Sequence, residues 1–292
     1  MITDADKNFP GSSFSANTEA HRHSFFAGII YNGNQVQLTN TINSVLRQKS
    51  SGLNVAISIF YGPGQVPQPI ASSGIVWIPF RQKEDFFKTI VHEIELCTAD
   101  YCTIVWNGEE LFDGAFDSAC QIFNKYAEVN WLTGIQTLRT ESGFNIALGS
   151  TAIRRWSYQL YERNLYKNSG RYIAPASTFW RKSIWKSISP QLYFISQNDF
   201  CEDLWVAFFK TQKLYTCKIY FSTVANYDKL NKHSFKQPNY SELIEDSVLN
   251  RVKEFFFINN VPYLRLFYRS AIGFAPVIRF DLNTQSFFLS PY

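Results

Sequence analysis

The stretch that decides the fold runs from residue 25 to residue 60; it begins FFAGIIYNGN (25–34) and ends NVAISIF (54–60). Both ends are short apolar runs rich in β-branched and aromatic residues, which is typical of buried strands. Apolar side chains recur between them at helical spacing, at Leu38, Ile42, Val45 and Leu46. A strand, a helix and a second strand with short connections predict parallel pairing and a right-handed crossover.

The same alternation continues beyond this unit. We expect strands over 75–78, 101–106 and 129–133 and helices over 87–94 and 115–126. Such a pattern predicts an α/β fold, with helices on both faces of an open, mostly parallel sheet. The second half is less regular. There we expect helices over 154–166, 178–187, 202–211 and 240–257, a strand over 214–221, and a hairpin of 277–280 and 286–289 around Asn283.

The composition excludes several classes of protein. A net charge of +4 over 292 residues is too weak to indicate nucleic-acid binding. Five cysteines without a CxxC pair predict reduced thiols rather than a disulfide framework or a zinc ribbon. The four histidines form no metal-binding motif. A polar beginning and the lack of a long apolar run predict a cytoplasmic protein with no membrane span.

Aromatic residues are abundant, at 17% of the chain. They could fill the core, or they could stack on sugars or bases, and composition leaves both interpretations open. Tyr31, Tyr61 and Trp106 are the rings that lie at or beside predicted strand ends.

Two groups of acids are candidates for chemistry, because ligands of open α/β sheets bind beyond the carboxyl ends of the strands. Glu109 and Glu110 follow the 101–106 strand. They could hold a divalent cation against a diphosphate, or begin a helix as acidic residues, and spacing alone favours the helix start. Asp199, Glu202 and Asp203 could cap a helix or supply a general base, and spacing does not rank these two roles.

The order of four segments resembles the family 2 glycosyltransferases, which have the GT-A nucleotide-diphospho-sugar transferase fold. The stretches IIYNG (29–33) and TINSVLRQ (41–48) are similar to the family's opening strand and its "SVL-Q" helix. The stretches IVWNGEE–FDGAF (104–116) and VNWLTG (129–134) are similar to its "LNSDD–LPGAL" and "VDWVTG" segments. STFWRKSIW (177–185) is similar to "STFWRRSLW", and DLWV (203–206) is similar to the acidic "DLW" motif.

The resemblance implies a GT-A-type α/β/α sandwich and transfer of a sugar from a nucleotide diphosphate to a hydroxyl. It implies that Glu110 is a ligand of Mg²⁺ or Mn²⁺, that Glu109 occupies the preceding acidic position, and that Asp203 is the base of an inverting reaction, with Glu202 or Asp199 as alternatives. The implied donor-binding residues are Tyr31, Asn32, Tyr61, Trp106, Asn107 and Glu109.

Three departures surround the implied pocket. The Asp-x-Asp motif is replaced by Gly108-Glu109-Glu110, Tyr61 stands beside the position of the base-reading acid, and Pro175-Ala176 replace a Gln-Glu pair. Either the enzyme uses an unusual donor or no tightly held metal, or the domain has lost catalysis and binds a glycan or a partner enzyme.

The expected organisation has three parts: a polar segment over 1–24, the glycosyltransferase-like domain over 25–230, and a C-terminal helical extension with a small hairpin over 231–292. The expected acceptor is a glycan or a lipid-linked saccharide, as in cell-surface polysaccharide biosynthesis. Residues 254–269 are basic and aromatic. They could touch the inner face of a membrane peripherally, or pack on the domain or on a second subunit to form a homodimer.

Overall fold

The structure is a computed structural model, which describes residues 23–51, 53–70, 74–82, 85–140, 143–147, 173–192, 200–224 and 276–290. The helices predicted at 154–166 and 240–257, the acid Asp199 and the segment 254–269 lie outside the described residues. No helix within the described ranges is long and apolar enough to cross a membrane.

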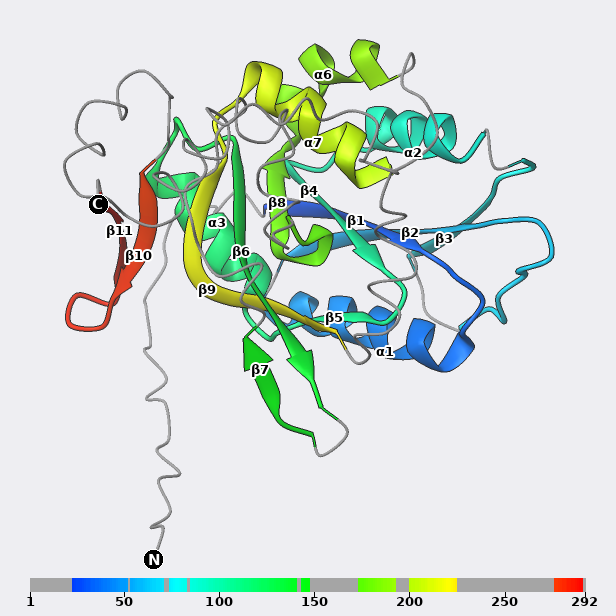
Figure 1. The fold of residues 1–292 in the computed structure, drawn as a ribbon, viewed down its shortest axis with the longest axis horizontal. Coiled ribbons are helices and arrows are strands. Elements are labelled where there is room, and N and C mark those ends of the chain that lie inside the picture. Colours follow the sequence, from blue (N-terminus) through cyan, green and yellow to red (C-terminus); the bar gives the residue numbers. More distant parts are fainter. Residues whose placement is uncertain are drawn as a thin grey trace, which may run out of the picture.

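A single mixed sheet runs through the molecule (Figure 1). Its strands lie in the order β11 (Ser286–Ser290), β10 (Val277–Asp281), β9 (Tyr215–Val224), β6 (Trp131–Arg139), β8 (Thr178–Arg181), β4 (Tyr101–Trp106), β1 (Ser24–Ile30), β2 (Asn54–Tyr61) and β3 (Ile75–Pro79). Two short strands lie off this path, where β5 (Glu109–Leu111) pairs with β9 and β7 (Asn145–Ala147) pairs with β6.

Most strands of the path point in one direction. β3, β2, β1 and β4 are parallel to one another, and so are β6, β9 and β10. β8 runs antiparallel between β4 and β6, and β11 runs antiparallel to β10. The predicted α/β class with a mostly parallel sheet is therefore confirmed, and the predicted C-terminal hairpin is present as β10 and β11. This hairpin extends the central sheet, because β10 pairs with β9.

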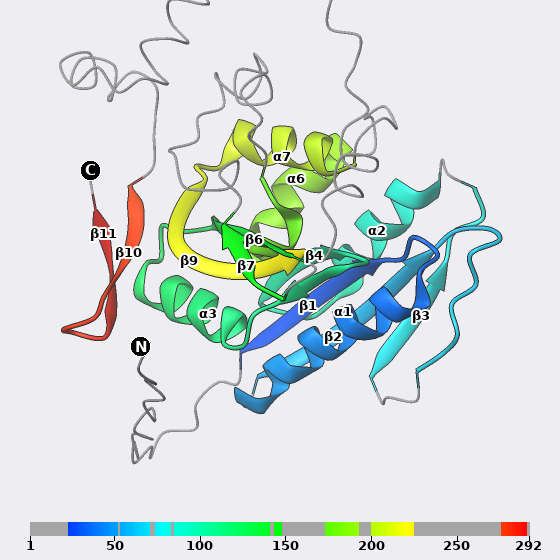
Figure 2. The same ribbon diagram turned by 60° about the horizontal axis from the view of Figure 1, so that its bottom comes forward.

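Helices cover both faces of the sheet (Figures 1 and 2). α1 (Gln35–Arg47) and α3 (Ala115–Lys125) lie on one face, and α2 (Asp85–Leu96), α6 (Trp185–Leu192) and α7 (Phe200–Thr211) lie on the other. Strand β1 serves both layers because side chains alternate along a strand. Its Phe25, Ala27 and Ile29 pack with α1 and α3, while Phe26 and Ile30 pack with α2, α6 and α7.

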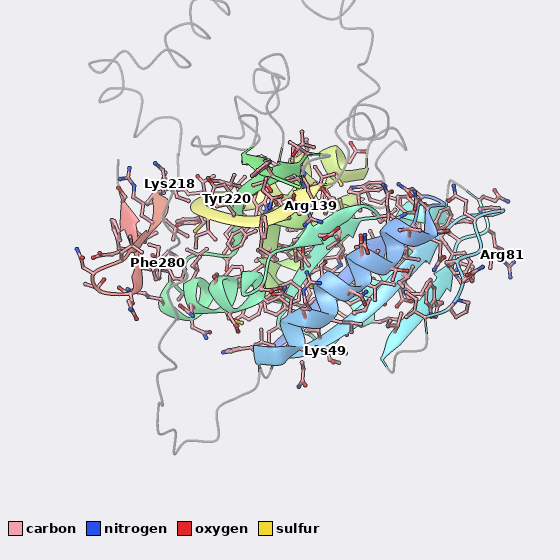
Figure 3. All side chains as sticks on the ribbon, turned by 90° about the horizontal axis from the view of Figure 1, so that it is seen from below. Lys49, Arg81, Arg139, Lys218, Tyr220 and Phe280 are labelled. Atoms are coloured by element: carbon pink, nitrogen blue, oxygen red, sulfur yellow. The ribbon has the colours of Figure 1, made fainter. Side chains whose placement is uncertain are left out.

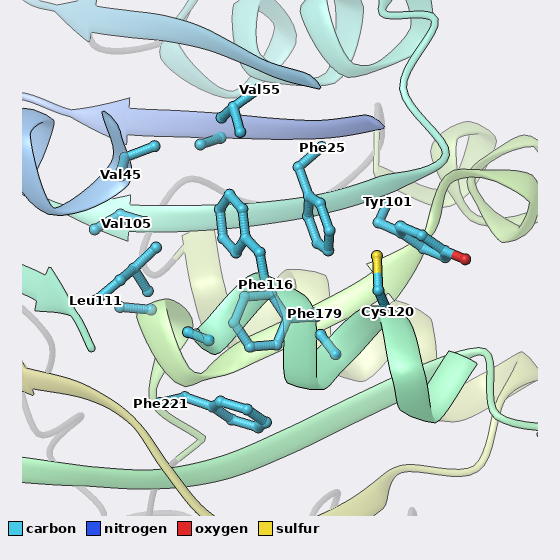
Figure 4. Close-up of a cluster of buried hydrophobic side chains, with 14 of the residues drawn as sticks. Phe25, Val45, Val55, Tyr101, Val105, Leu111, Phe116, Cys120, Phe179 and Phe221 are labelled. Carbon is cyan, nitrogen blue, oxygen red and sulfur yellow. The ribbon is translucent and has the colours of Figure 1, made fainter. Parts of the chain in front are cut away.

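The aromatic residues fill these two layers. The phenylalanine cluster, which consists of Phe25, Phe116, Phe179 and Phe221, lies on the α1 and α3 side (Figure 4). Phe25 and Phe116 stack with ring centroids 4.1 Å apart, and Phe179 meets Phe221 edge to face at 5.0 Å. On the other face Trp131, Trp180, Trp185 and Trp205 are buried with Phe208. Core filling therefore accounts for most of the aromatic residues in the described ranges.

The segment 178–187, predicted to be a helix, begins instead as strand β8. Trp180 of β8 lies between Cys102 of β4 and Trp131 of β6 in the ladder. A short 3₁₀ turn, η3 (Lys182–Ile184), then leads into α6. The prediction was wrong at this point because pairing on both sides with distant strands outweighs the local helical spacing.

One close approach holds β6 against β9. An ideal Cβ on Gly134 would lie 2.2 Å from Phe221 Cδ2 and 2.8 Å from the Ile219 carbonyl oxygen. The β6–β9 register shifts at the same place, between Thr133 and Ile135. Only glycine leaves room here for the Phe221 ring and the Ile219 carbonyl. Gly134 therefore allows both the irregular pairing with β9 and the position of the Phe221 side chain.

Candidate functional site

The candidate site lies at the carboxyl ends of β1, β2 and β4, which meet at one edge of the sheet. Beyond the ladder itself, the Asn107 N–H donates to the Ile30 carbonyl and the Tyr31 N–H to the Phe60 carbonyl, each at 2.9 Å. The residues that follow these strands are thus held side by side. This is the edge where the fold class places ligands.

Asn32 and Asn107, both expected to bind the donor, lie side by side. The Asn107 side-chain amide donates to Asn32 Oδ1 and, at 3.0 Å, to the carbonyl of Asn34. Asn34 in turn caps α1 by accepting from the Gln37 N–H at 3.0 Å. The turn after β1, the start of α1 and the end of β4 are therefore one hydrogen-bonded unit.

Two amide oxygens of this unit point to no donor. Asn107 Oδ1 and Gln37 Oε1 are buried and have no hydrogen-bond partner among the residues that the structure describes. Asn107 is only 6% exposed, so a missing partner is costly unless water or a ligand supplies it. Gly108 lies between them with φ of +98°, and an ideal Cβ there would stand 3.2 Å from Gln37 Oε1. A side chain at position 108 would therefore crowd the Gln37 amide.

The three rings at the strand ends do not form one stacking surface. Tyr31 is buried, and Tyr61 is partly buried; both pack into the core on the α1 and α3 side. Trp106 packs partly buried on the opposite side, with α2, α6 and α7. Tyr31 is thus a core ring with little surface for a donor, because the alternation along β1 turns it toward α1.

Glu109 lies in a strand, not at the start of a helix. Its carboxylate accepts from the Trp106 N–H at 2.8 Å and from Gln136 Nε2 at 2.7 Å, and the Ala176 N–H also donates to it. Burial raises the pKa of Glu109 to about 7, and these donors act in the opposite direction. Glu109 therefore ties β4, β6 and the 3₁₀ turn η2 (Pro175–Ser177) together from inside the protein.

Glu110 points the other way. Its carboxylate receives both contacts of Arg139 Nη1, at 3.0 and 3.2 Å. The Glu110 side chain is 11% exposed and the Arg139 side chain 36% exposed. Figure 3 labels Arg139 on the face seen from below. Arg139 ends β6, so the cation stands at the same edge of the sheet as the end of β4.

These two acids do not fit a shared divalent cation. Successive residues of a strand face opposite sides, so the carboxylates of Glu109 and Glu110 diverge. One is enclosed by donors and the other is paired with a guanidinium. Among the described residues no group of three or more His, Cys, Asp or Glu side chains is arranged to hold a metal ion. The interpretation of this acidic pair as a helix start was wrong, because both residues lie in strand β5, which pairs with β9.

The second acidic group lies on α7, which begins at Phe200, close to the predicted 202. Asp203 is partly buried; of Glu202 only the backbone is described, and Asp199 lies outside the described residues. α7 touches the end of β4 through Trp106, whose indole N–H donates to Cys201 Sγ at 3.4 Å. Asp203 lies two positions beyond Cys201, which turns it to another side of the helix.

Sequence reasoning missed four residues of this site: Gln37, Gln136, Arg139 and Cys201. Gln136, Arg139 and Cys201 contribute through partners distant in the chain, for example 95 residues away for Trp106 and Cys201. No local spacing signals such contacts, because they depend on how β5, β6 and α7 meet.

No protein-family model matches the chain, and no curated protein matches it. Among solved structures, residues 1–349 of S. aureus TarS align over 69% of this chain with a TM-score of 0.47 and 9% identity. The longer S. aureus TarS structure has a TM-score of 0.46 and 8% identity over 70% of this chain, and TarS 1–349 in complex with UDP has 0.45 and 9% over 70%. The aligned part spans 60%, 37% and 60% of those chains, respectively.

Proposed function

We propose that the protein is a glycosyltransferase that moves a sugar from a nucleotide diphosphate to a hydroxyl of a glycan or lipid-linked acceptor. One observation carries this proposal. Two of the segments that resemble family 2 glycosyltransferases end at the same edge of the sheet, where Asn107 bonds to Asn32, and Trp106 of one of them donates to Cys201 of α7, the helix that carries DLWV (203–206). Motifs that are far apart in the sequence are thus neighbours at the edge where such a donor would bind.

The proposed donor contacts are polar rather than aromatic. The unpartnered Asn107 Oδ1 can accept from an N–H or O–H group of a nucleoside, and Gln37 Oε1 lies across Gly108 from it. Arg139 is the cation that could face a diphosphate, because its guanidinium is partly exposed. Tyr61 and Trp106 remain candidates for contact with the rest of the donor.

The proposed reaction does not depend on a cation held between Glu109 and Glu110. Mg²⁺ or Mn²⁺ would need both carboxylates to turn away from their present partners. We propose that Asp203 accepts the proton of the acceptor hydroxyl as that oxygen bonds to the sugar and the nucleoside diphosphate leaves with inversion. Glu202 and Asp199 are the alternative bases.

A second candidate function is a catalytically silent module that binds a glycan or a partner enzyme. The arrangement of the acids favours it, because Glu109 is enclosed by three donors and Glu110 is paired with Arg139. We also propose the acceptor named above and, for residues 254–269, which lie outside the described ranges, a peripheral membrane contact or a homodimer contact.

A panel of nucleotide sugars separates the two functions. Binding would be measured by calorimetry and donor turnover by release of the nucleoside diphosphate, with and without EDTA. The proposal expects binding and slow hydrolysis of one donor that survive EDTA, and loss of turnover but not of binding in Asp203→Asn. Binding without turnover for any donor would support the silent module. Neither binding nor turnover with any common donor would overturn the glycosyltransferase.

A further inference from the structure

A pair of thiols lies at the opposite end of β4 from the candidate site. Cys97 follows the last residue of α2, and Cys102 is the second residue of β4. Both are reduced. The Cys102 thiol donates to the Cys97 sulfur, and Cys97 Sγ donates to the Ile94 carbonyl at 3.2 Å. The two sulfurs are thus neighbours, although four residues separate them in the chain.

Their exposure differs. Cys102 is completely buried between β1 and β8, whereas Cys97 is only partly buried. A reagent in solution therefore meets Cys97 first, and Cys102 lies behind it. This is the order that an attacking thiol and a resolving thiol require.

Charge around the pair favours the Cys97 thiolate. The hydrogen bond from Cys102 has the largest effect and lowers the pKa of Cys97. The Ala99 N–H and the Lys182 ammonium also lower it, whereas burial and Glu93 raise it. The pKa of Cys97 falls to about 7 as a result. Lys182 is held in place because its Nζ donates to the carbonyls of Cys97 at 2.9 Å and Glu95 at 3.1 Å. Burial raises the pKa of Cys102 well above its usual value.

We propose that Cys97 is an oxidation site, at which a peroxide forms a sulfenic acid that Cys102 resolves to an intramolecular disulfide. In the first step the Cys97 thiolate attacks one peroxide oxygen: the O–O bond breaks, an S–O bond forms, the sulfur is oxidised and hydroxide leaves. In the second step the Cys102 sulfur attacks the Cys97 sulfur. The S–S bond forms, the S–O bond breaks, and the leaving hydroxide takes the Cys102 proton as water. A dithiol reductant reverses the product.

The test uses the full chain and hydrogen peroxide near neutral pH, with peptide mapping by mass spectrometry. We expect the loss of two hydrogens and a cross-linked pair of peptides that contain Cys97 and Cys102. Before oxidation, iodoacetamide should label Cys97 at least about tenfold faster than Cys120 or Cys217 in the folded protein. Labelling of Cys97 should slow in Lys182→Met.

Variants separate the two roles. In Cys102→Ala, dimedone should trap a sulfenic acid at Cys97, and no disulfide should form. Cys120→Ala is the matched control, because Cys120 is buried and the pKa of its thiol is raised to about 12; it should still form the disulfide. If Cys102→Ala fails to fold, peptide mapping of the unaltered chain still decides. A disulfide that joins other cysteines, or labelling of Cys97 no faster than of Cys120, would overturn the proposal.

Discussion

The phenylalanine cluster and the polar cluster at the end of β4, defined as Asn32, Asn107, Glu109 and Gln136, are both largely buried but are held together by different forces. The first is a non-directional contact of rings, each of which contributes apolar area. The second is a set of directional hydrogen bonds in which each group depends on its partner. A buried ring removed from the first should therefore cost packing alone, whereas a change in the second should show in pH dependence and binding.

The largest expected loss of stability follows from removing a ring of the phenylalanine cluster. Phe179→Ala should lower the free energy of unfolding by about 3–5 kcal/mol, because Phe179 is fully buried against Phe25, Phe116 and Phe221. Chemical denaturation at about pH 5 and about pH 8 should give the same loss. Phe288→Ala, at a ring 42% exposed, is the control and should cost less than about 1 kcal/mol.

A somewhat smaller loss of stability is expected when a side chain is added where the phenylalanine cluster meets the sheet. Gly134→Ala puts a methyl group against Phe221 and the Ile219 carbonyl, and should cost about 1–3 kcal/mol. Gly64→Ala is the contrasting control, since no atom lies within 4 Å of its Cβ position and only its positive φ opposes the change. Equal melting temperatures for the two variants would contradict the assigned role of Gly134.

The next prediction concerns the polar cluster, whose contribution to the free energy of unfolding should depend on pH, unlike that of the phenylalanine cluster. Burial raises the pKa of Glu109 from an ordinary value of 4.5 to about 7 in the folded protein. Below about pH 4.5 its carboxyl is neutral in both states, and between there and about 7 the unfolded chain ionises first, so this group's contribution to stability is lost as the pH rises.

Glu109→Gln should remove that fall, and it should cost about 1–2 kcal/mol at low pH because one of its donors loses an acceptor. Urea unfolding measured across this pH range tests both effects. Glu110→Gln is the matched control and should keep the fall. A Glu109→Gln curve parallel to that of the unaltered chain would show that the pKa of Glu109 is the same in the folded and the unfolded chain.

The smallest expected effect on stability lies at the rim of the polar cluster. Arg139→Met should change the free energy of unfolding by less than about 1 kcal/mol, since the guanidinium is partly exposed and its pair with Glu110 is screened by solvent. Under the proposed function, the same change should weaken donor binding several-fold. Arg47→Met, which breaks a more exposed pair with Asp113, should leave donor binding unchanged. Equal donor affinity in both variants would remove Arg139 from the site.

Much of the fold was readable from local pattern. The expected strand at 101–106 matches β4, and the expected helix at 115–126 ends within one residue of α3. Rings such as Phe25, Phe179 and Trp205 are buried, which is one of the two roles that composition left open. These features follow from apolar periodicity, which records the face that each element turns to its neighbours.

The candidate site was less predictable. Asn32 and Asn107 lie side by side because the ends of parallel strands meet. Tyr31 is buried on the α1 and α3 side, and proximity to a strand end does not say which side of the sheet a ring faces. For Glu109 and Glu110 the helix start was wrong, because β5 forms only through pairing with β9, more than a hundred residues later.

Apolar spacing in the chain was sufficient to establish the class of fold, the elements of its first half and the apolar faces of its helices, because these depend on neighbours within a few residues. Only the tertiary structure determined three features: the partners of Glu109 and Glu110, the antiparallel position of β8 between β4 and β6, and the contact between Trp106 and α7. Each of them joins segments that are distant in the sequence. Hydrogen bonds and ion pairs are directional and short-ranged, so their partners are defined by position in space and not by position in the sequence.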